Sequence, residues 1–398
     1  MTAAPTRTAG LPQLLVLLAA SSLSVLGAVL IAPVLPQMSA HFADVPGVGV
    51  LVPLVLTVPA LVIGLTAPFA GVIVDRIGRI RILLVALVVY AAAGTAPLWL
   101  DDLGSIIASR VVVGVCEAAI MTSATTLIGD YWTGDRRNRY LGLQATVATI
   151  SATAFIAVGG ALGVGGWRAP FWMYLVSLIL VIPAARLLWT DDGSSFAKDS
   201  VRVSLPWRAL VVPCLVSVVG GAVFYALIVQ LSFVLNGIGV TSSGLIGAAT
   251  AVMSIATAIG AALFGKLVQL GRRTLLTAEF ALAGAGLVVV FASGSLPVIL
   301  LGAVITGFAT GVLLPTLLTW AVDRLDYAAR GRGTGLWTGA LFVGEFLSPL
   351  VIAAFAAVAG GLRGGIAVLG VLSVAVAVAL WIALNGHRGR RSEPVQLA

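Results

Sequence analysis

The chain has 398 residues, of which 60% are hydrophobic and only 10% are charged. Soluble domains carry about 25% charged residues, so this composition excludes a soluble globular protein and indicates one embedded in a membrane. The net charge of +8 would suit a nucleic-acid partner, but the basic residues lie between apolar segments, where they would face the membrane surface. No nucleic-acid partner is therefore expected.

Twelve apolar segments follow one another along the chain, each long enough to cross a membrane as a helix. Helices and closed barrels are the two structures that satisfy their backbone hydrogen bonds in lipid, and the sequence lacks the alternating polarity of barrel strands. The predicted spans are 12–36, 47–70, 80–100, 103–129, 140–163, 169–189, 207–235, 242–265, 274–293, 296–322, 334–358 and 363–385. We therefore predict an all-α membrane protein with twelve transmembrane helices in two six-helix bundles.

A polar stretch at residues 190–206 interrupts the apolar pattern halfway along the chain. We interpret it as a cytoplasmic linker between an N-terminal six-helix bundle, residues 1–189, and a C-terminal bundle, residues 207–398, which ends in a short basic tail. The bundle boundaries follow from the position of this stretch.

An internal repeat relates the two halves. Gly114 corresponds to Gly307 and Asp130 to Asp323, each pair 193 residues apart. Six spans separate the members of each pair, so both halves insert into the membrane in the same direction. Parallel halves of this kind are typical of two-bundle transporters with a central path.

The basic residues predict the orientation. All but three of the 23 lysines and arginines fall in loops, helix ends or tails on the side of the amino terminus. The exceptions are Arg110, inside a span, and Arg168 and Arg363, on the other side. Because basic loops remain cytoplasmic, we predict a multi-pass protein of the cell membrane with both termini in the cytoplasm.

The stretch between the second and third spans has the pattern G-x-x-x-D-R-x-G-R, from Gly71 to Arg79. Gly71 and Gly78 would permit a tight turn, Asp75 could cap a facing helix, and Arg76 and Arg79 could anchor at an anionic leaflet. This pattern resembles the signature loop of the major facilitator superfamily.

The resemblance extends to the fourth span, where Arg110 and Gly114 match the R-x-x-x-G pattern of that superfamily. It implies a secondary transporter whose two bundles alternate in opening a central cavity to either side. It also implies that Asp130 contacts Arg76, and that this junction closes the cytoplasmic side together with the start of the eleventh span near Thr334.

Three isolated charges inside spans are the main candidates for function. Arg110 and Glu117 are seven residues apart, about 700° of helix rotation, so both lie on one face of the fourth span. They could form a proton and substrate site, or a structural pair in which Glu117 neutralises Arg110. Glu345 lies near the middle of the eleventh span without a basic neighbour there, and an intramembrane acid of this kind is a functional candidate by default.

Other polar or aromatic residues of the interior helices could line a cavity: Gln144, Tyr225, Gln230, Asn236, Trp337 and Phe342. Glu279 differs from them because it lies about one turn into the ninth span, near Arg272 and Arg273. We predict that Glu279 forms a salt bridge at the membrane interface.

We predict proton-coupled efflux of small amphipathic compounds, as in the drug:proton antiporter branch that the chain resembles, with Glu117 and Glu345 exchanging protons with substrate. The fifth span keeps Gly159 and Gly160 of that branch's G-P-x-x-G-G motif and lacks its Gly-Pro.

Two alternatives remain open: proton-coupled symport of an organic anion or sugar-like solute, with Arg110 binding an anion, and transport of a lipid or lysolipid. A receptor or sensor is disfavoured by the short tails.

The sequence contains no convincing P-loop, and no histidine lies within a span. We therefore predict that the chain is not an enzyme and needs no cofactor or metal. The expected partners are a small-molecule substrate, protons and the lipid bilayer, and the expected state is a monomer.

Overall fold

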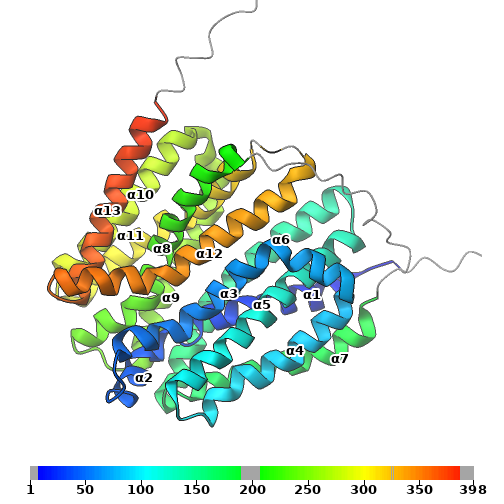
Figure 1. The fold of residues 1–398 in the computed structure, drawn as a ribbon, viewed down its shortest axis with the longest axis horizontal. Coiled ribbons are helices and arrows are strands. Elements are labelled where there is room, and N and C mark those ends of the chain that lie inside the picture. The colour runs from blue at the N-terminus through cyan, green and yellow to red at the C-terminus, as the bar shows by residue number, and fades with distance from the viewer. Residues whose placement is uncertain (1–7, 190–206, 324, 326, 386–398) are drawn as a thin grey trace, which may run out of the picture.

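Twelve helices long and apolar enough to cross a membrane form the computed structural model, which describes residues 8–189, 207–323, 325 and 327–385. The predicted linker 190–206 and the basic C-terminal tail lie outside the described residues. The fold is the predicted all-α architecture of two six-helix bundles, which Figure 1 shows side by side.

The first bundle runs from blue to green at the lower right of Figure 1. Its elements are α1 (Leu11–Val29), η1 (Ala32–Val34), α2 (Leu35–His41), α3 (Val48–Ile77), α4 (Arg79–Thr95), η2 (Ala96–Leu98), α5 (Leu103–Tyr131), α6 (Gly134–Leu162), η3 (Gly163–Gly165), η4 (Ala169–Leu175) and α7 (Val176–Leu187). The first span is divided into three pieces at Pro33 and Pro36, because proline cannot donate a backbone hydrogen bond inside a helix.

The second bundle runs from green to red at the upper left of Figure 1. Its elements are α8 (Trp207–Gly237), α9 (Ser243–Leu267), η5 (Val268–Leu270), α10 (Arg272–Ala292), α11 (Leu296–Val322), α12 (Tyr327–Val358) and α13 (Leu362–Ala383). The peripheral pair α10 and α13 packs closely because Gly284 and Gly370 face each other, which lets the two backbones approach.

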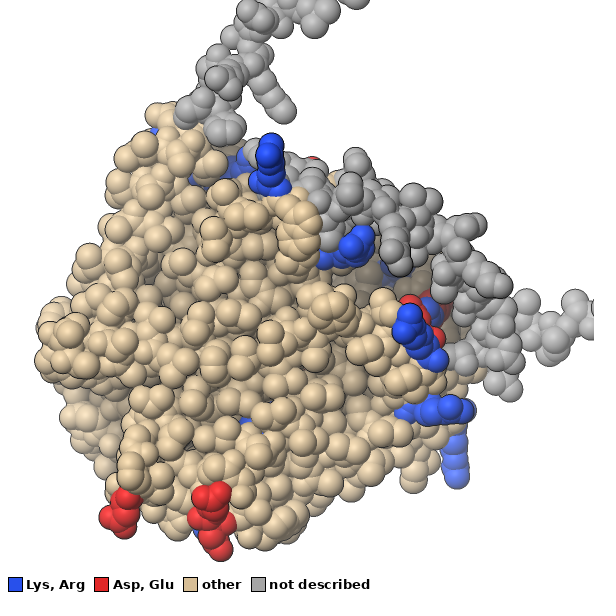
Figure 2. Space-filling view, viewed as in Figure 1, with Lys and Arg blue, Asp and Glu red and all other residues tan. Residues whose placement is uncertain are grey.

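Charged residues separate the two ends of the molecule. One end, here called the basic end, contains the α3–α4 junction and, among the described residues, Arg76, Arg79, Arg81, Arg136, Arg137, Arg139, Arg186, Arg208, Lys266, Arg272, Arg273 and Arg332. Arg168 and Arg363 lie at the opposite end, as do Asp44, Asp101 and Asp102. Figure 2 shows the basic groups along the upper right edge, acidic groups at the lower edge and an uncharged band between them.

The two bundles contact each other through α3 with α12 and through α6 with α9. Away from the basic end, the hydroxyls of Thr153 and Ser254 are 2.7 Å apart, and a Cβ added to Gly160 would lie 2.7 Å from the Gly247 Cα. Near the basic end, glycines of the same four helices have open space around them: Gly71, Gly142, Gly265 and Gly331. These interbundle contacts, Thr153–Ser254 and Gly160–Gly247, therefore lie away from the basic end.

The predicted loop at residues 71–81 is almost entirely helical, which corrects the sequence interpretation. Helix α3 continues to Ile77 and α4 begins at Arg79, so Gly78, with φ +106°, alone forms the break. Gly71 lies inside α3 and takes no part in the turn. Hydrophobicity predicts where lipid contact ends, but a helix continues past that point wherever its backbone hydrogen bonds can.

Candidate functional site

Glu117 lies at the centre of α5, equally far from Leu103 and Tyr131. Its side chain is fully buried, and its Oε1 accepts hydrogen bonds from the Tyr90 hydroxyl and the Gly27 N–H, both at 3.1 Å. Its Oε2 is buried without a hydrogen-bond partner among the described residues. Ionising a carboxyl group at this depth is costly, so the group is suited to holding a proton.

Three helices position this carboxyl group. Gly27 lets α1 lie directly against it, because a Cβ at that position would overlap Glu117 Oε1. Tyr90 reaches it from α4, and the same hydroxyl also donates to the Leu23 carbonyl of α1 at 2.8 Å. Glu117 is thus held by α1, α4 and its own helix, α5.

Arg110 lies on α5, two turns closer to the opposite end, and is as deeply buried as Glu117. Its guanidinium donates to the carbonyls of Ala93 and Gly94, at 2.8 and 3.1 Å, and to the Tyr174 hydroxyl at 3.1 Å. These partners belong to the end of α4 and to η4. Arg110 therefore joins three elements of the first bundle.

A direct ion pair between Arg110 and Glu117, one alternative left open by the sequence, is not what the structure shows. Each charged side chain is hydrogen-bonded to a different tyrosine: Tyr174 accepts from Arg110, and Tyr90 donates to Glu117. The two tyrosine rings pack with their centroids 5.0 Å apart. The helical spacing placed both charges in the interior correctly, but it could not show that aromatic side chains supply their partners.

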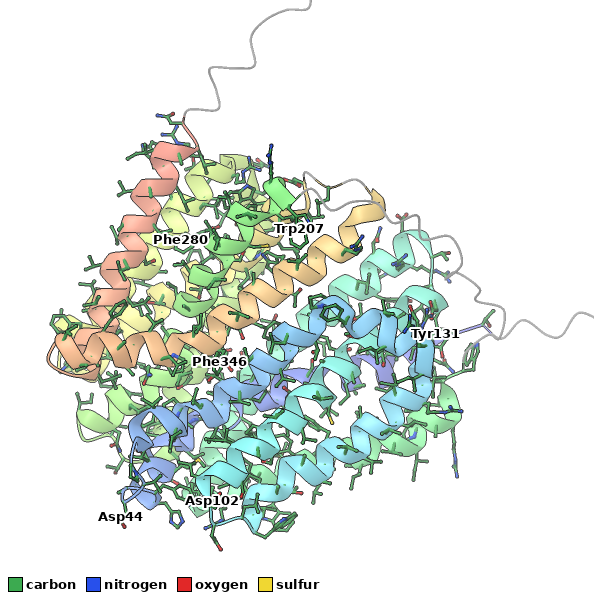
Figure 3. The ribbon with its side chains drawn as sticks, in the orientation of Figure 1. Asp44, Asp102, Tyr131, Trp207, Phe280 and Phe346 are labelled. Carbon is green, nitrogen blue, oxygen red and sulfur yellow. The ribbon has the colours of Figure 1, made fainter. Side chains whose placement is uncertain are left out.

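Glu345 lies at matching depth in the second bundle, midway along the span Gly331–Val358. It is 5% exposed, and the structure gives its carboxyl group no hydrogen-bond or ion-pair partner among the described residues. Helix α8 packs against its backbone, since a Cβ on Gly221 would lie 3.1 Å from the Glu345 nitrogen. Figure 3 labels the next residue, Phe346, on α12 near the middle of the molecule.

Tyr225 connects the two carboxyl sites. It is a buried residue of α8, and its hydroxyl donates to the Ala28 carbonyl of α1 at 2.5 Å, across the contact between the bundles. It lies within electrostatic range of both Glu117 and Glu345. Both acids therefore lie near one tyrosine whose hydroxyl bonds across the contact between the bundles.

The other cavity-lining candidates have different surroundings. The Gln144 amide donates to Ser21 Oγ at 2.7 Å and to Thr125 Oγ1 at 3.0 Å, which joins α6 to α1 and α5. Phe342 faces α3, because a Cβ on Gly64 would lie 3.2 Å from its own Cβ. Phe342 adjoins the contact between the bundles, Gln144 joins three helices of the first bundle, and both remain candidates.

The three remaining candidates have other surroundings. Trp337 packs in the core of the second bundle, where its indole N–H has no partner among the described residues. Gln230 is buried in the half of α8 near the opposite end. Asn236 is exposed at the end of α8, and its carbonyl accepts from the Gly239 N–H of the following turn. We therefore leave Asn236 out of the proposed site.

Glu279 does not form the predicted interfacial salt bridge. Its side chain is 3% exposed, its Oε1 accepts from the Thr316 hydroxyl at 2.6 Å, and its Oε2 has no partner in the described chain. The nearby Arg273 instead contacts the Trp381 carbonyl and the Asn385 side chain. The helix rotates Glu279 inwards, towards α11, whereas the sequence showed only its distance from the basic end.

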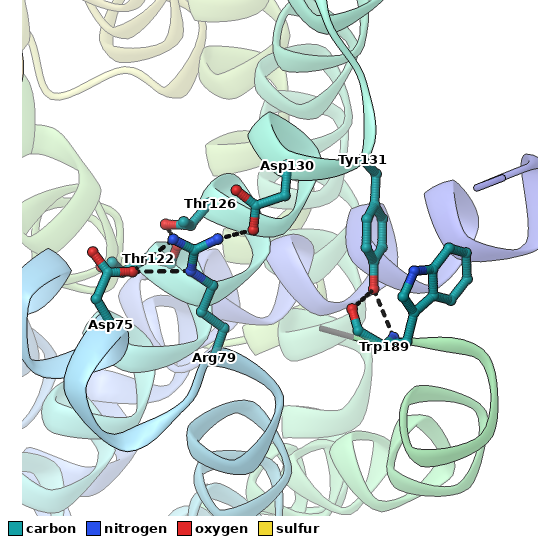
Figure 4. Close-up of polar contacts among 7 residues, drawn as sticks. All are labelled: Asp75, Arg79, Thr122, Thr126, Asp130, Tyr131 and Trp189. Carbon is teal, nitrogen blue, oxygen red and sulfur yellow. Dashed lines mark hydrogen bonds and ion pairs between the residues drawn. The ribbon is translucent and has the colours of Figure 1, made fainter. Parts of the chain in front are cut away.

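The signature stretch forms an ion-pair junction at the basic end, drawn in Figure 4. Arg79 contacts Asp75 at 2.8 Å and also contacts Asp130 at the end of α5. The expected partner of Asp130 was Arg76, and this assignment is wrong: Gly78 turns the chain so that the arginine after it faces Asp130. Asp75 binds this arginine instead of capping a facing helix.

This junction does not reach the start of α12 as expected. Thr334 lines a pocket of about 350 Å³ together with Leu318, Thr319, Val322 and Asp323 of the second bundle. Helix α12 approaches α3 at the next residue, where a Cβ on Gly335 would lie 3.4 Å from the Pro68 Cα.

Tyr90, Tyr174 and Gly27 are site residues that the sequence interpretation missed. Tyr90 interrupts an otherwise apolar run in the third span, and a lone hydroxyl there was the available signal, because a buried tyrosine hydroxyl needs a partner. Gly27 had no comparable signal, since the chain has 46 glycines and a glycine offers no side-chain group that would mark it.

The comparisons with known proteins agree with this architecture. Two stretches of the chain, residues 17–241 and 214–397, match the family model of the Major Facilitator Superfamily. The chain belongs to the major facilitator superfamily. Two solved structures have a similar fold. One is a bacterial homologue of the human lysosomal transporter Spinster in an inward-facing, occupied conformation (TM-score 0.74, 16% identity, 94% of this chain and 96% of that one). The other is a D-xylose–proton symporter (TM-score 0.78, 14% identity, 93% of this chain and 97% of that one).

Several curated relatives of this superfamily member are named for drug resistance. The chloramphenicol resistance protein of Streptomyces lividans is 27% identical over 335 residues, 80% of this chain and 82% of that protein. Multidrug resistance protein 2 of Bacillus subtilis is 26% identical over 283 residues, 66% of each. The class C tetracycline resistance protein of Escherichia coli is 31% identical over 163 residues, and this match spans only 40% of each chain.

Proposed function

We propose that this membrane protein is a proton-coupled exporter of small amphipathic compounds that works by alternating access. The observation that carries the proposal is the pair of buried carboxyl groups, Glu117 and Glu345, at the same depth on either side of the bundle contact. A buried carboxyl group without a cation partner is stable when protonated and can ionise when a cationic or polar substrate replaces the proton. Substrate and protons would then compete for one site, which is the requirement for antiport.

Named relatives support the choice of cargo. The relatives above are called chloramphenicol, tetracycline and multidrug resistance proteins, so small drug-like molecules are the first substrates to test. A single chain contains both bundles and both acids, and we propose that the monomer is the working unit.

We propose that the basic end faces the cytoplasm, which would place both termini there. Lysine and arginine are retained on the cytoplasmic side of membranes, and among the described residues the opposite end has only Arg168 and Arg363. With this orientation, the interbundle contacts Thr153–Ser254 and Gly160–Gly247 lie towards the outer side of the membrane.

The charge environment favours export over symport of an organic anion. In that alternative Arg110 binds the anion, but its guanidinium already donates to two backbone carbonyls and to Tyr174. Two buried acids and a basic residue with its donors already in use suit a neutral or cationic cargo.

Transport by purified protein in proteoliposomes tests the proposal. An imposed pH gradient should drive accumulation of a fluorescent hydrophobic cation, and Glu117→Gln and Glu345→Gln should each lower the initial rate by tenfold or more, about 1.4 kcal/mol of coupling. Glu279→Gln is a matched control, a third buried acid away from the bundle contact. The proposal fails if both central variants keep the full pH-driven rate.

A further inference from the structure

Two backbone groups of α1 that would pair with each other in a regular helix have side-chain partners from other helices. In an α-helix the carbonyl of one residue accepts from the N–H four residues later. Here the Leu23 carbonyl accepts from the Tyr90 hydroxyl at 2.8 Å, and the Gly27 N–H donates to Glu117 Oε1 at 3.1 Å. The carboxyl group is thus connected directly to the backbone of α1.

The Tyr90 hydroxyl has two acceptors within reach but only one hydrogen. Its oxygen is 2.8 Å from the Leu23 carbonyl and 3.1 Å from Glu117 Oε1. A hydroxyl group donates once and can accept through its lone pairs. The hydrogen must therefore point either to the α1 backbone or to the carboxyl group.

The protonation of Glu117 decides between the two orientations. When Glu117 is ionised, it can only accept, and the charge draws the Tyr90 hydrogen towards it. When Glu117 is protonated, its O–H can donate to the Tyr90 oxygen, and the Tyr90 hydrogen turns to the Leu23 carbonyl. Proton binding thus forms one O–H bond and adds the Tyr90 hydroxyl to the hydrogen-bond partners of the Leu23 carbonyl.

The affected turn of α1 also contacts the other bundle. Ala28 follows Gly27, and its carbonyl accepts from Tyr225 of α8 at 2.5 Å. A hydrogen-bond rearrangement between Leu23 and Gly27 shifts the next carbonyl in the same turn. Proton binding in the first bundle is therefore one residue away from a bond that joins the bundles.

We propose that Tyr90 is a positioning residue that transmits the protonation of Glu117 through the α1 segment Leu23–Ala28 to the interbundle bond of Tyr225. This inference rests on the proposed proton site and adds the route by which that site reaches the bundle contact. It assigns no contact with substrate to Tyr90.

Other titratable groups around Glu117 do not offer the same route. The side chains near it are Tyr90 of α4, Arg110 and Cys116 of α5, Tyr174 of η4 and Tyr225 of α8. Helix α1 has no titratable side chain, and α3, which packs against α5, has none before Asp75. Among these groups, the hydroxyl of Tyr90 alone contacts both Glu117 and the α1 backbone.

The test combines an infrared and a distance measurement on the full chain in lipid nanodiscs. The carbonyl band of protonated Glu117, identified by its loss in Glu117→Gln, reports proton binding. Spin labels on Asp44→Cys and Thr241→Cys, exposed positions of the two bundles at the opposite end, report the bundle contact in a Cys214→Ser background. Both are measured between about pH 5.5 and about pH 8.5, which spans the range where a buried carboxyl group can titrate.

In the wild type, the distance between the two spin labels should change over the same pH range as the intensity of the Glu117 carbonyl band. Tyr90→Phe should keep the titrating band at a changed frequency and lose most of the distance shift, whereas Ser177→Ala, which removes a second buried hydroxyl of the bundle, should keep the shift. If Tyr90→Phe does not fold, Tyr225→Phe replaces it, with an unchanged band and a lost shift expected.

The experiment distinguishes failure of the proposed route from failure of the proposed proton site. A distance shift of wild-type size in Tyr90→Phe, or in Tyr225→Phe where it stands in, overturns the proposed route while leaving the proton site intact. The absence of any Glu117 band in the wild type overturns the proton site itself, and the route with it.

Discussion

Glu117 and Glu345 lie at the same depth in the two bundles, but their surroundings differ. Glu117 accepts two hydrogen bonds, from Tyr90 and Gly27, whereas the structure gives the Glu345 carboxyl group none among the described residues. Donors stabilise a carboxylate, and a buried carboxylate without donors is costly. Hydrogen bonds therefore hold the Glu117 carboxyl group in place. The ionisation of Glu345 would instead need a partner that enters the site, such as a substrate.

The internal repeat explains part of this asymmetry. At the repeat offset, Glu117 corresponds to Thr310 and Glu345 to Ala152. Thr310 donates to the Thr306 carbonyl of its own helix at 2.8 Å, so it does not take the place of Glu117 in joining several helices. The repeat preserves helix packing, while each bundle carries its acid on a different helix.

Two glycines, Gly27 of α1 and Gly221 of α8, give the largest expected difference. A Cβ on Gly221 would overlap the backbone carbonyl of Leu341, which cannot rotate away, whereas a Cβ on Gly27 would overlap the end of the Glu117 side chain. Gly221→Ala should cost about 3 kcal/mol or more of stability, and Gly27→Ala about 1 kcal/mol. Thermal unfolding in detergent measures both, and Gly71→Ala, which adds its methyl group to open space, is the control. Equal melting temperatures for Gly221→Ala and Gly27→Ala would contradict the expected difference in their loss of stability.

Leucine substitutions compare the two acids directly. Glu117→Leu removes the acceptor of two buried donors and should destabilise the fold by about 1–3 kcal/mol. Glu345→Leu removes a buried polar group without a described partner and should leave the melting temperature unchanged or raise it. Thermal unfolding at about pH 7, where proteins are usually compared, measures the difference. A loss in Glu345→Leu as large as in Glu117→Leu would show that Glu345 has a partner after all.

The basic-end junction should affect transport more than stability. Exposed ion pairs contribute about 0–1 kcal/mol each, so Arg79→Gln should change the melting temperature little. It should lower the transport rate severalfold, because Arg79 joins Asp75 to Asp130 at the end of the helix that holds Glu117. Arg76→Gln, one turn away, is the matched control in proteoliposomes. Equal rates in the two variants would argue against a role for this junction in the cycle.

Substitution of Asp102 should have the smallest effect on stability, and the direction in which this effect changes with pH follows from its pKa. It caps α5, and the hydrogen bond from the Ser105 N–H, at 2.7 Å, lowers the pKa of this exposed carboxyl group. A lowered pKa stabilises the fold above the unfolded-state value of about 3.9, and this stability is lost as the pH falls through the folded-state pKa. Asp102→Ala should therefore lower the melting temperature slightly near neutral pH and not at all in strong acid. A difference that does not depend on pH would contradict this assignment.

Much of the fold was predictable because a membrane leaves few choices. The twelve spans, the two bundles and the inward placement of Glu117, Glu345 and Arg110 follow from apolar length and helical spacing. The helix ends were less predictable: α3 continues seven residues past its apolar stretch, so Asp75 and Arg76 are helical. Backbone hydrogen bonding, which hydrophobicity does not report, decides where such a helix ends.

The partners of the polar groups were beyond prediction from the sequence. Each residue along a helix rotates a side chain by about 100°, so the difference between Arg76 and Arg79, or between an interfacial and a buried Glu279, depends on how neighbouring helices are rotated and how they cross. The sequence by itself determined the number of spans and the depth of each charge, because both scale with distance along a helix. Only the tertiary structure decided that Tyr90 and Gly27 hold Glu117, that carbonyl groups hold Arg110 and that Tyr225 bonds to the α1 backbone, because those contacts join helices far apart in the chain.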